Sequence, residues 1–334
     1  MRNTIIALFI TILSTLPYAT FAQQSDSVKI FVDSALNIMQ KHSMYSGKVN
    51  WKEVRLKVKD LAAHAKNYAN AGEAVKYAFN ALGDRHGWLV LDDKDYRNPD
   101  FKPDTGRLSA NIKAAAAKGP KVYAGKVDGY VYISIPFFGG QDTVSMNAFA
   151  QRIQDSLCNY LSRDTKGVIL DLRLNAGGNL YPMVVGVSNI YGSQYEKGKS
   201  FAGDWEIKDH QVKLSETFYA RLKTNCGDYT HLPVAVLVGP VTGSSGEFLA
   251  IGFSTRPNSI LIGERTAGFT TANMGYLLPG KDNGIVLSES VAIDKNGLSY
   301  PDGITPQILV KGDDFFHWEN DPKIQVALAW LKKQ

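Results

Sequence analysis

From residue 129 onward, short apolar runs of strand length alternate with amphipathic runs of helix length. Near-continuous apolar runs occupy residues 167–173 and 233–238. Apolar residues recur at intervals of three and four over residues 147–161 and 182–190, which favours helices. Apolar strands separated by helices are typical of a mostly parallel sheet covered on both faces. The alternation therefore predicts an α/β fold for the body of the chain.

The first hundred residues carry a different pattern. Helical periodicity runs through residues 28–39, 51–69 and 71–82, and a polar stretch with two prolines follows at residues 92–118. We interpret that stretch as a linker or a peripheral excursion, because it is too short for another domain. The pattern predicts a helical N-terminal region at residues 23–100, followed by a catalytic domain at residues 101–334.

The extreme N-terminus has the composition of a secretory signal. Arg2 is followed by an apolar run at residues 5–16 and by Ala-Thr-Phe-Ala at residues 19–22. We predict a signal peptide at residues 1–22, cleaved near Ala22, and export to the periplasm or the extracellular space. The apolar run is too short for a membrane span, so we expect no stable membrane anchor.

Composition and charge narrow the class of protein. Apolar residues make up 44% of the chain and charged residues 21%, as in globular proteins. The formal net charge is +5, and the basic residues are dispersed, so we expect no nucleic-acid partner. Cys158 and Cys226 are the two cysteines. An exported compartment permits a bridge between them, but Cys158 also fits a helical pattern as an apolar residue, so their pairing stays open, as does the oligomeric state.

Ser244 lies in the small-residue turn Thr-Gly-Ser-Ser-Gly-Glu at residues 242–247, between an apolar strand and a helical run. Backbone N–H groups at a helix start, together with the positive end of the helix dipole, favour a developing anion. A serine there is a candidate nucleophile if a base reaches it. The alternative is that Ser244 or Ser245 only caps the helix.

Two further places suggest chemistry. His86 stands between a helical run and a strand-like run, where catalytic side chains often project, although a lone histidine also fits a structural role. The turn Asn-Ala-Gly-Gly-Asn at residues 175–179 follows a parallel strand, where α/β folds place their sites. Its glycines fit half of an oxyanion hole, or a turn that needs positive φ.

Four blocks together resemble the tail-specific, or C-terminal processing, serine peptidases and their relatives in the tricorn core. The blocks are Leu-Gly-Asp-Arg-His at 82–86, Val-Ile-Leu-Asp-Leu-Arg-Leu-Asn-Ala-Gly-Gly at 168–178, Thr-Gly-Ser-Ser-Gly-Glu at 242–247 with Ile-Gly-Glu-Arg-Thr-Ala-Gly at 262–268, and Gly-Ile-Thr-Pro-Gln-Ile-Leu-Val at 303–310. Their order matches the family. The resemblance implies a ClpP/crotonase-like catalytic core.

The resemblance also implies roles for single residues. Ser244 matches the nucleophile, and the N–H groups of Ser245 and of Gly177 or Gly178 match the oxyanion hole. Most processing peptidases carry a lysine base after Gly-Glu-Arg-Thr, but Phe269 takes that place here and cannot accept a proton. The tricorn-like branch uses a histidine from an earlier block, which His86 matches, and a neutral imidazole is a suitable base near neutral pH.

Two departures from the family pattern concern the third catalytic residue and the architecture. Tricorn relatives orient the histidine with a carboxylate just before the last block. Tyr300 occupies the aligned position, and Asp302, two residues later, is our candidate, although its Pro-Asp-Gly context also fits a plain turn. About forty residues separate His86 from Gly129, too few for an inserted PDZ domain.

The sequence therefore predicts an exported serine peptidase that hydrolyses a polypeptide substrate by acyl transfer, with no cofactor. No His-Glu-x-x-His or clustered Cys/His pattern suggests a metal. The competing hypothesis is an inactive peptide-binding protein on the same scaffold. A crotonase-like acyl-thioester enzyme would share the fold, but export from the cytoplasm disfavours it.

Overall fold

The body of the protein is built on a six-stranded sheet with the strand order β14-β11-β10-β5-β4-β3. Neighbours from β14 to β4 are parallel, and only β3 pairs in the antiparallel sense. The strands are β3 (Tyr123–Val127), β4 (Tyr130–Ser134), β5 (Val168–Asp171), β10 (Val234–Val238), β11 (Ser259–Gly263) and β14 (Ile308–Leu309). The predicted α/β fold is confirmed.

The computed structural model describes residues 26–101, 104–192, 197–200, 203–208, 211–214, 217–312, 314–315 and 320–334. The predicted signal peptide and its cleavage point lie outside these residues. No helix within the described residues is long and apolar enough to cross a membrane.

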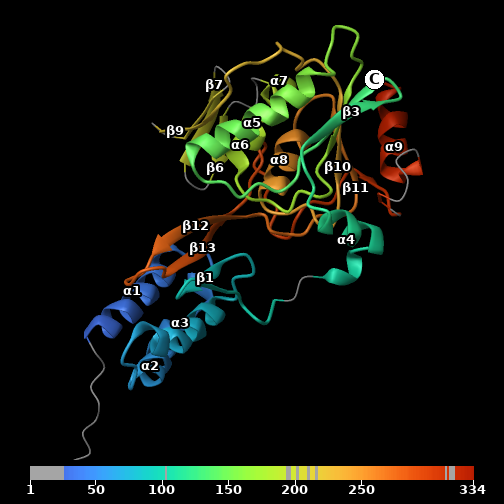
Figure 1. Cartoon of the computed structure of the whole chain (residues 1–334). Helices are drawn as coiled ribbons and strands as arrows, with labels where there is room; N and C mark the ends of the chain where they lie inside the picture. Colours follow the sequence, from blue (N-terminus) through green and yellow to red (C-terminus); the bar gives the residue numbers. More distant parts are fainter. Residues whose placement is uncertain are drawn as a thin grey trace, which may run out of the picture.

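Helices cover both faces of the central sheet (Figure 1). On one face, alternate strand residues such as Leu170 and Val236 pack against α5 (Thr143–Cys158), α6 (Leu180–Gly186) and α8 (Ser245–Ser254). On the other face, Ile169 and Leu237 pack against α9 (Pro322–Leu331). Successive residues of a strand point to opposite faces, so strands covered on both sides must be apolar throughout. This explains the unbroken apolar runs in the sequence.

The N-terminal unit combines helices with a four-stranded sheet of order β12-β13-β1-β2. Its elements are α1 (Asp26–His42), α2 (Trp51–Ala62), α3 (Tyr68–Leu82), β1 (Trp88–Leu91), β2 (Lys94–Tyr96), β12 (Thr271–Leu277) and β13 (Gly284–Val291). Trp88 of β1 pairs with Val286 of β13, and one apolar core joins the three helices to this sheet. The region expected to be helical is thus completed by a hairpin from the second half of the chain (Figure 1).

The stretch expected to be a linker contains β2, a 3₁₀ turn (η2, Thr105–Arg107) and α4 (Ala110–Ala117). Another 3₁₀ turn (η1, Ser46–Lys48) joins α1 to α2, and α7 (Ser188–Tyr191) follows α6. An antiparallel sheet beside α5 and α6 consists of β6 (Lys197–Ser200), β7 (Gly203–Lys208), β8 (Gln211–Leu214) and β9 (Thr217–Arg221). Between His86 and Gly129, the described residues form no PDZ-sized unit.

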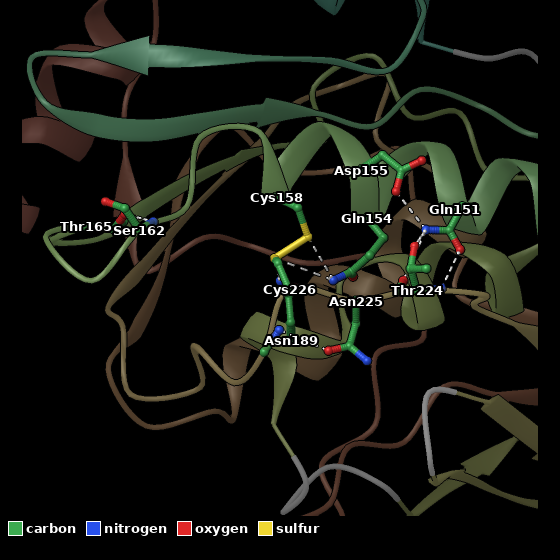
Figure 2. Close-up of a disulfide and its surroundings, with 11 residues drawn as sticks. Gln151, Gln154, Asp155, Cys158, Ser162, Thr165, Asn189, Thr224, Asn225 and Cys226 are labelled. Atoms are coloured by element: carbon green, nitrogen blue, oxygen red, sulfur yellow. Dashed lines mark hydrogen bonds between the residues drawn. A yellow bond between two sulfur atoms is a disulfide. The ribbon is translucent and has the colours of Figure 1, made fainter.

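A disulfide joins Cys158, the last residue of α5, to Cys226 in the segment between β9 and β10 (Figure 2). The two Cα atoms are 5.6 Å apart, within the normal range for a bridge. The Gln154 side-chain amide points at both sulfurs. The pairing that the sequence left open is therefore present, and the apolar interpretation of Cys158 is wrong. Disulfides persist mainly in oxidising compartments, which agrees with the expected export.

Candidate active site

The predicted nucleophile turn and the predicted oxyanion turn lie side by side because β5 and β10 are parallel neighbours. Both turns leave the carboxyl ends of these strands. The Gly243 N–H donates to the Asn175 carbonyl at 2.9 Å, and the Thr242 hydroxyl donates to the Leu172 carbonyl at 2.8 Å. Two segments about seventy residues apart are thereby held as one surface.

A buried ion cluster fixes the start of the oxyanion turn. The Arg173 guanidinium donates to the Asp171 and Asp321 carboxylates at 2.6 Å each, and all three side chains are buried. The buried guanidinium is held in place by these carboxylates, because breaking a buried ion pair would leave an uncompensated charge inside the protein. Arg173 therefore joins the end of β5 to the start of α9, two residues before the turn begins at Asn175.

Ser244 has an unusual backbone conformation at the start of α8. Its φ is 51° and its ψ is −120°, a region that residues other than glycine rarely adopt. The Glu247 carboxylate stabilises this bend by accepting the Ser244 N–H at 2.9 Å. Ser244 is partly exposed, whereas Ser245 is buried and donates its hydroxyl to the Gly178 carbonyl at 2.5 Å. Strained residues of this kind cluster at functional sites, and a sharp strand-to-helix turn presents the side chain of its apex residue.

Glu247 is a buried carboxylate that organises the surroundings of Ser244. Besides the Ser244 N–H, it accepts the Thr266 hydroxyl at 2.5 Å and the N–H groups of Gly268 and Phe269 at 2.9 and 2.8 Å. Burial raises the pKa of Glu247, while these donors act in the opposite direction. Four converging donors suit an ionised carboxylate, which can only accept.

The two glycines of the oxyanion turn differ in their hydrogen bonding. The Gly177 N–H donates to the Asn175 side chain at 2.9 Å. The N–H groups of Gly178 and Ser245 make no hydrogen bond to the part of the chain that the structure describes. Of the two alternatives for the oxyanion donor, the geometry favours Gly178.

Both glycines are also required by the backbone. Gly177 and Gly178 have φ values of 109° and 102°. A Cβ on Gly177 would lie 2.6 Å from Ser244 Cβ, and one on Gly178 would lie 2.0 Å from the Phe138 carbonyl oxygen. The turn therefore needs glycine for its positive φ, and this requirement is compatible with a role in an oxyanion hole.

His86 lies in the loop between α3 and β1 and faces the β12–β13 hairpin. Its Nδ1 is 2.8 Å from the Thr271 hydroxyl, which is 3.0 Å from the Ser288 hydroxyl, which donates to the buried Asp84 carboxylate at 2.8 Å. The Asn273 side-chain oxygen lies within hydrogen-bonding distance of both hydroxyls, and its amide nitrogen donates to the His86 carbonyl. We refer to Thr271, Ser288 and Asp84 as the hydroxyl relay.

The hydroxyl relay assigns the proton on the imidazole. Each hydroxyl has one proton, and the Ser288 proton goes to the Asp84 carboxylate. The Thr271 proton then goes to the Ser288 oxygen or to the Asn273 side-chain oxygen, and in either case His86 donates from Nδ1 to Thr271. The lone pair consequently lies on Nε2, as a general base needs. Burial is the main cause that lowers the pKa of His86 to about 4, so the imidazole is neutral at pH 7.

Ser244 and His86 are connected through Phe269 rather than directly. Phe269, which stands where the processing peptidases have lysine, places its ring 5.0 Å from the His86 ring. Its N–H donates to the same Glu247 oxygen that accepts the Ser244 N–H. Within the described residues, no hydrogen bond joins the Ser244 hydroxyl to His86.

Asp302 lies apart from the imidazole. Its exposed carboxylate is 4.0 Å from the Arg85 guanidinium. No hydrogen bond or ion pair to His86 is present among the described residues. The sequence did not indicate a role for four polar side chains of this region, namely Asp84, Thr271, Ser288 and Glu247. Asp84 stands in the Gly-Asp-x-His block and Glu247 three residues after Ser244, but Thr271 and Ser288 carry no local signal.

A cavity of about 530 Å³ opens beside the nucleophile turn. Its wall includes Gly243 and Ala176, which flank Ser244 and Gly177 in sequence, and also Phe269. The lining also includes the segment around η2, to which Arg107 belongs, and the side chains of Arg85 and Arg265. The described residues contain no group of three or more His, Cys, Asp or Glu side chains that could hold a metal ion.

Two known proteins resemble this chain in sequence, the first along most of its length. It is 27% identical over 318 residues to the nisin-resistance protein of Lactococcus lactis subsp. lactis, covering 91% of this chain and 87% of that protein. It is 28% identical over 169 residues to the carboxy-terminal processing protease CtpA of Bacillus subtilis, covering 50% of this chain and 33% of that protein.

The fold is also known from a solved structure. A lipoprotein from Streptococcus agalactiae superposes with a TM-score of 0.69 at 20% identity, covering 98% of this chain and 99% of that one. The family model described as peptidase family S41 matches residues 129–310, which contain five of the six strands of the central sheet and both turns of the site. The protein belongs to peptidase family S41.

Proposed function

We propose that the protein is an exported serine peptidase in which Ser244 is the nucleophile and His86 is the general base. The observation that carries the proposal is the backbone of Ser244, held at positive φ at a helix start beside two N–H groups that bond to no described residue. A serine that only capped α8 would need neither the strain nor the unpaired donors of Gly178 and Ser245.

The proposed reaction is acyl transfer. His86 Nε2 takes the proton of the Ser244 hydroxyl as its oxygen bonds to the scissile carbonyl carbon. The N–H groups of Ser245 and Gly178 donate to the resulting oxyanion. When the C–N bond breaks, the imidazolium returns the proton to the leaving amine. A water molecule then attacks the acyl carbon while His86 Nε2 accepts its proton, and the imidazolium returns that proton to Ser244 Oγ as the acyl C–O bond breaks and the new C-terminal carboxyl group is released.

The hydroxyl relay supports His86 as the base. It keeps a proton on Nδ1, which donates to the Thr271 hydroxyl oxygen, and so leaves Nε2 available as an acceptor. The buried Asp84 carboxylate, reached through two hydroxyls, then takes the orienting role for which Asp302 was the candidate. Catalytic hydrogen bonds are often long without substrate, so the absent bond between Ser244 and His86 is compatible with this role.

The substrate is proposed to be a peptide outside the cytoplasm. Export is supported by the signal-like first 22 residues and by the disulfide. The L. lactis relative, named for resistance to nisin, aligns with nearly the whole chain, so small extracellular peptides are the first substrates to test. The cavity beside Ser244 has the volume of an ordinary ligand site.

The test is labelling of the purified chain with a fluorophosphonate, which reacts covalently with an activated serine. The wild type is expected to be labelled, and Ser244→Ala and His86→Ala are expected to lose labelling. Ser254→Ala is the matched control, because Ser254 ends the same helix and its hydroxyl donates to the Ile251 carbonyl, away from the nucleophile turn.

Two results would contradict the proposal. If folded wild type shows neither labelling nor peptide cleavage, the peptidase proposal fails and the hypothesis of a peptide-binding protein on this scaffold is favoured. If Ser244→Ala is labelled like the wild type, another serine is the nucleophile.

A further inference from the structure

A buried ionic cluster lies at the carboxyl edge of the central sheet, on the face that α9 covers (Figure 1). Its described members are four carboxylates and two cations, namely Asp171, Asp314, Asp321, Glu264, Arg173 and Lys323. Asp171 and Glu264 each lie two residues after an isoleucine that packs against α9. Because side chains alternate along a strand, the cluster continues the apolar rows of this face.

Lys323 connects the ends of two strands through this cluster. It lies in the first turn of α9, and its side chain is fully buried. Its ammonium donates to the Asp314 carboxylate at 2.5 Å and to the Glu264 carboxylate at 3.0 Å. The same Asp314 oxygen is 3.4 Å from the Arg173 guanidinium. Lys323 thereby joins the residue that follows β11 to the arginine that follows β5.

Asp314 depends on these two cations. Its Oδ1 atom faces Lys323 and Arg173, whereas its Oδ2 atom is buried and has no hydrogen-bond partner among the described residues. Removal of the ammonium would leave Arg173 as the one described cation beside Asp314. A buried carboxylate that loses its nearest cation is strongly destabilised, so its surroundings must rearrange.

The stems of both cations cross strand ends where the chain has glycine. A Cβ on Gly239, directly after β10, would lie 3.7 Å from Arg173 Cγ. A Cβ on Gly263, the last residue of β11, would lie 3.3 Å from Lys323 Cε. The cluster therefore packs against the backbone at the end of β10, the strand that leads to Ser244.

The two ends of the cluster lead to opposite sides of Ser244. Arg173 precedes the oxyanion turn by two residues. Glu264 precedes Thr266 by two residues, and the Thr266 hydroxyl donates to Glu247. Glu247 is the carboxylate that accepts the Ser244 N–H. A change in the distance between Arg173 and Glu264 would therefore change the distance between the oxyanion turn and the support of the nucleophile.

We propose that Lys323 is a positioning residue of the active site, which fixes the spacing between the oxyanion turn and the Thr266 segment by pairing with Asp314 and Glu264. The inference rests on the proposed peptidase function and adds a residue to its machinery. A buried ion pair contributes little to stability compared with apolar side chains of similar volume, but it holds its partners in one geometry. Lys323 acts through these partners and not on the substrate.

The test is Lys323→Met, which keeps the aliphatic stem and removes the ammonium. Saturation kinetics of fluorophosphonate labelling give the maximal rate at Ser244 and, separately, the probe concentration at half-maximal rate. We expect the maximal rate to fall about 10- to 100-fold, as when a reacting group is displaced by about 1 Å. The half-saturating concentration should stay at the wild-type value, because the probe still binds.

Leu328→Ala is the matched control, because Leu328 packs in the apolar core under the same helix and carries no charge. It should lower the urea midpoint but leave the maximal labelling rate of the folded protein unchanged. A wild-type maximal rate in Lys323→Met, or an equal loss of rate in Leu328→Ala, would overturn the inference while leaving the peptidase function intact.

A milder variant covers the case in which Lys323→Met does not fold. Glu264 is 21% exposed, and Glu264→Gln keeps an oxygen that accepts a hydrogen bond from Lys323. A neutral acceptor binds the ammonium less strongly than a carboxylate does, so we expect the maximal rate to fall about threefold. An unchanged rate would overturn the proposed link from Lys323 to the segment after β11.

Failure of the peptidase function has a different signature, because then the wild type is not labelled at all. The position of the site is then measured from the amide resonances of Gly178 and Ser245 in nuclear magnetic resonance spectra. Lys323→Met should shift both resonances, and Leu328→Ala should leave them in place. Unshifted resonances in Lys323→Met would overturn the inference whether or not the serine reacts.

Discussion

Replacing Thr271 by valine tests the hydroxyl relay with little change of shape. The substitution removes the hydroxyl that is 2.8 Å from His86 Nδ1 and leaves the strand β12 backbone and the side-chain volume nearly unchanged. The Nδ1 proton then loses its acceptor. The imidazole can shift its proton to Nε2, and in that form it cannot accept the Ser244 proton.

The magnitude follows from the burial of the relay. Thr271 is 6% exposed and Ser288 and Asp84 are 0% exposed, so water does not replace the lost hydroxyl. A buried donor left without a partner costs about 1–3 kcal/mol, which corresponds to about 5- to 150-fold in rate. We expect the rate of fluorophosphonate labelling at Ser244 to fall within that range, and Ser288→Ala to lower it by a similar amount.

Thr270→Val is the matched control. Thr270 is the preceding residue, is also buried, and donates its hydroxyl to the Tyr300 carbonyl rather than toward His86. Nitrogen chemical shifts of His86 should report a proton on Nδ1 in the wild type and in Thr270→Val, but on Nε2 in Thr271→Val. Labelling of Thr271→Val within twofold of the wild type, or an equal loss in Thr270→Val, would refute the assignment of the relay.

Three further predictions concern pH, the buried glutamate and the disulfide. Because burial lowers the pKa of His86 to about 4, the rate of fluorophosphonate labelling should stay constant from pH 7 to about pH 5 and fall toward pH 4. A pH–rate curve with its midpoint near 6.5, the ordinary pKa of histidine, would contradict the burial of the base. The unfolded chain binds the His86 proton at higher pH than the folded one, so the free energy of unfolding should decrease as pH falls from about 6.5 to 4, and His86→Gln should weaken this dependence. Glu247→Gln weakens four converging hydrogen bonds, so it should lower the free energy of unfolding in urea titrations by about 3 kcal/mol and reduce labelling of Ser244. Wild-type values for both quantities would show that Glu247 does not hold the turn. Replacing Cys158 and Cys226 by alanine opens a link across 68 residues and should lower the free energy of unfolding by about 2–4 kcal/mol, with an unchanged urea midpoint as the contrary result.

The parallel sheet and the place of Ser244 could be predicted because their signals are local. A strand covered on both faces must be apolar along its length, so β5 and β10 can be recognised in the sequence as short apolar runs. Each run is followed directly by its turn, and parallel strands bring their carboxyl ends to one edge of the sheet. The end of α2 was predicted less well from the sequence. The helical pattern runs to residue 69, but the helix ends at Ala62, and the chain then turns toward Asn67, which caps α3.

The sequence alone therefore determined the α/β body and the two turns, and it led to the proposal of His86 rather than a lysine as the base. Only the tertiary structure decided what surrounds the imidazole. Thr271 is 185 residues from His86, and Ser288 is 204 residues from Asp84. These groups meet because the β12–β13 hairpin leaves the catalytic body and pairs with β1 of the N-terminal unit. The cavity beside the nucleophile turn and the disulfide likewise join segments distant in the chain. Such contacts depend on which apolar faces pack together over the whole molecule, and no short stretch of residues encodes that packing.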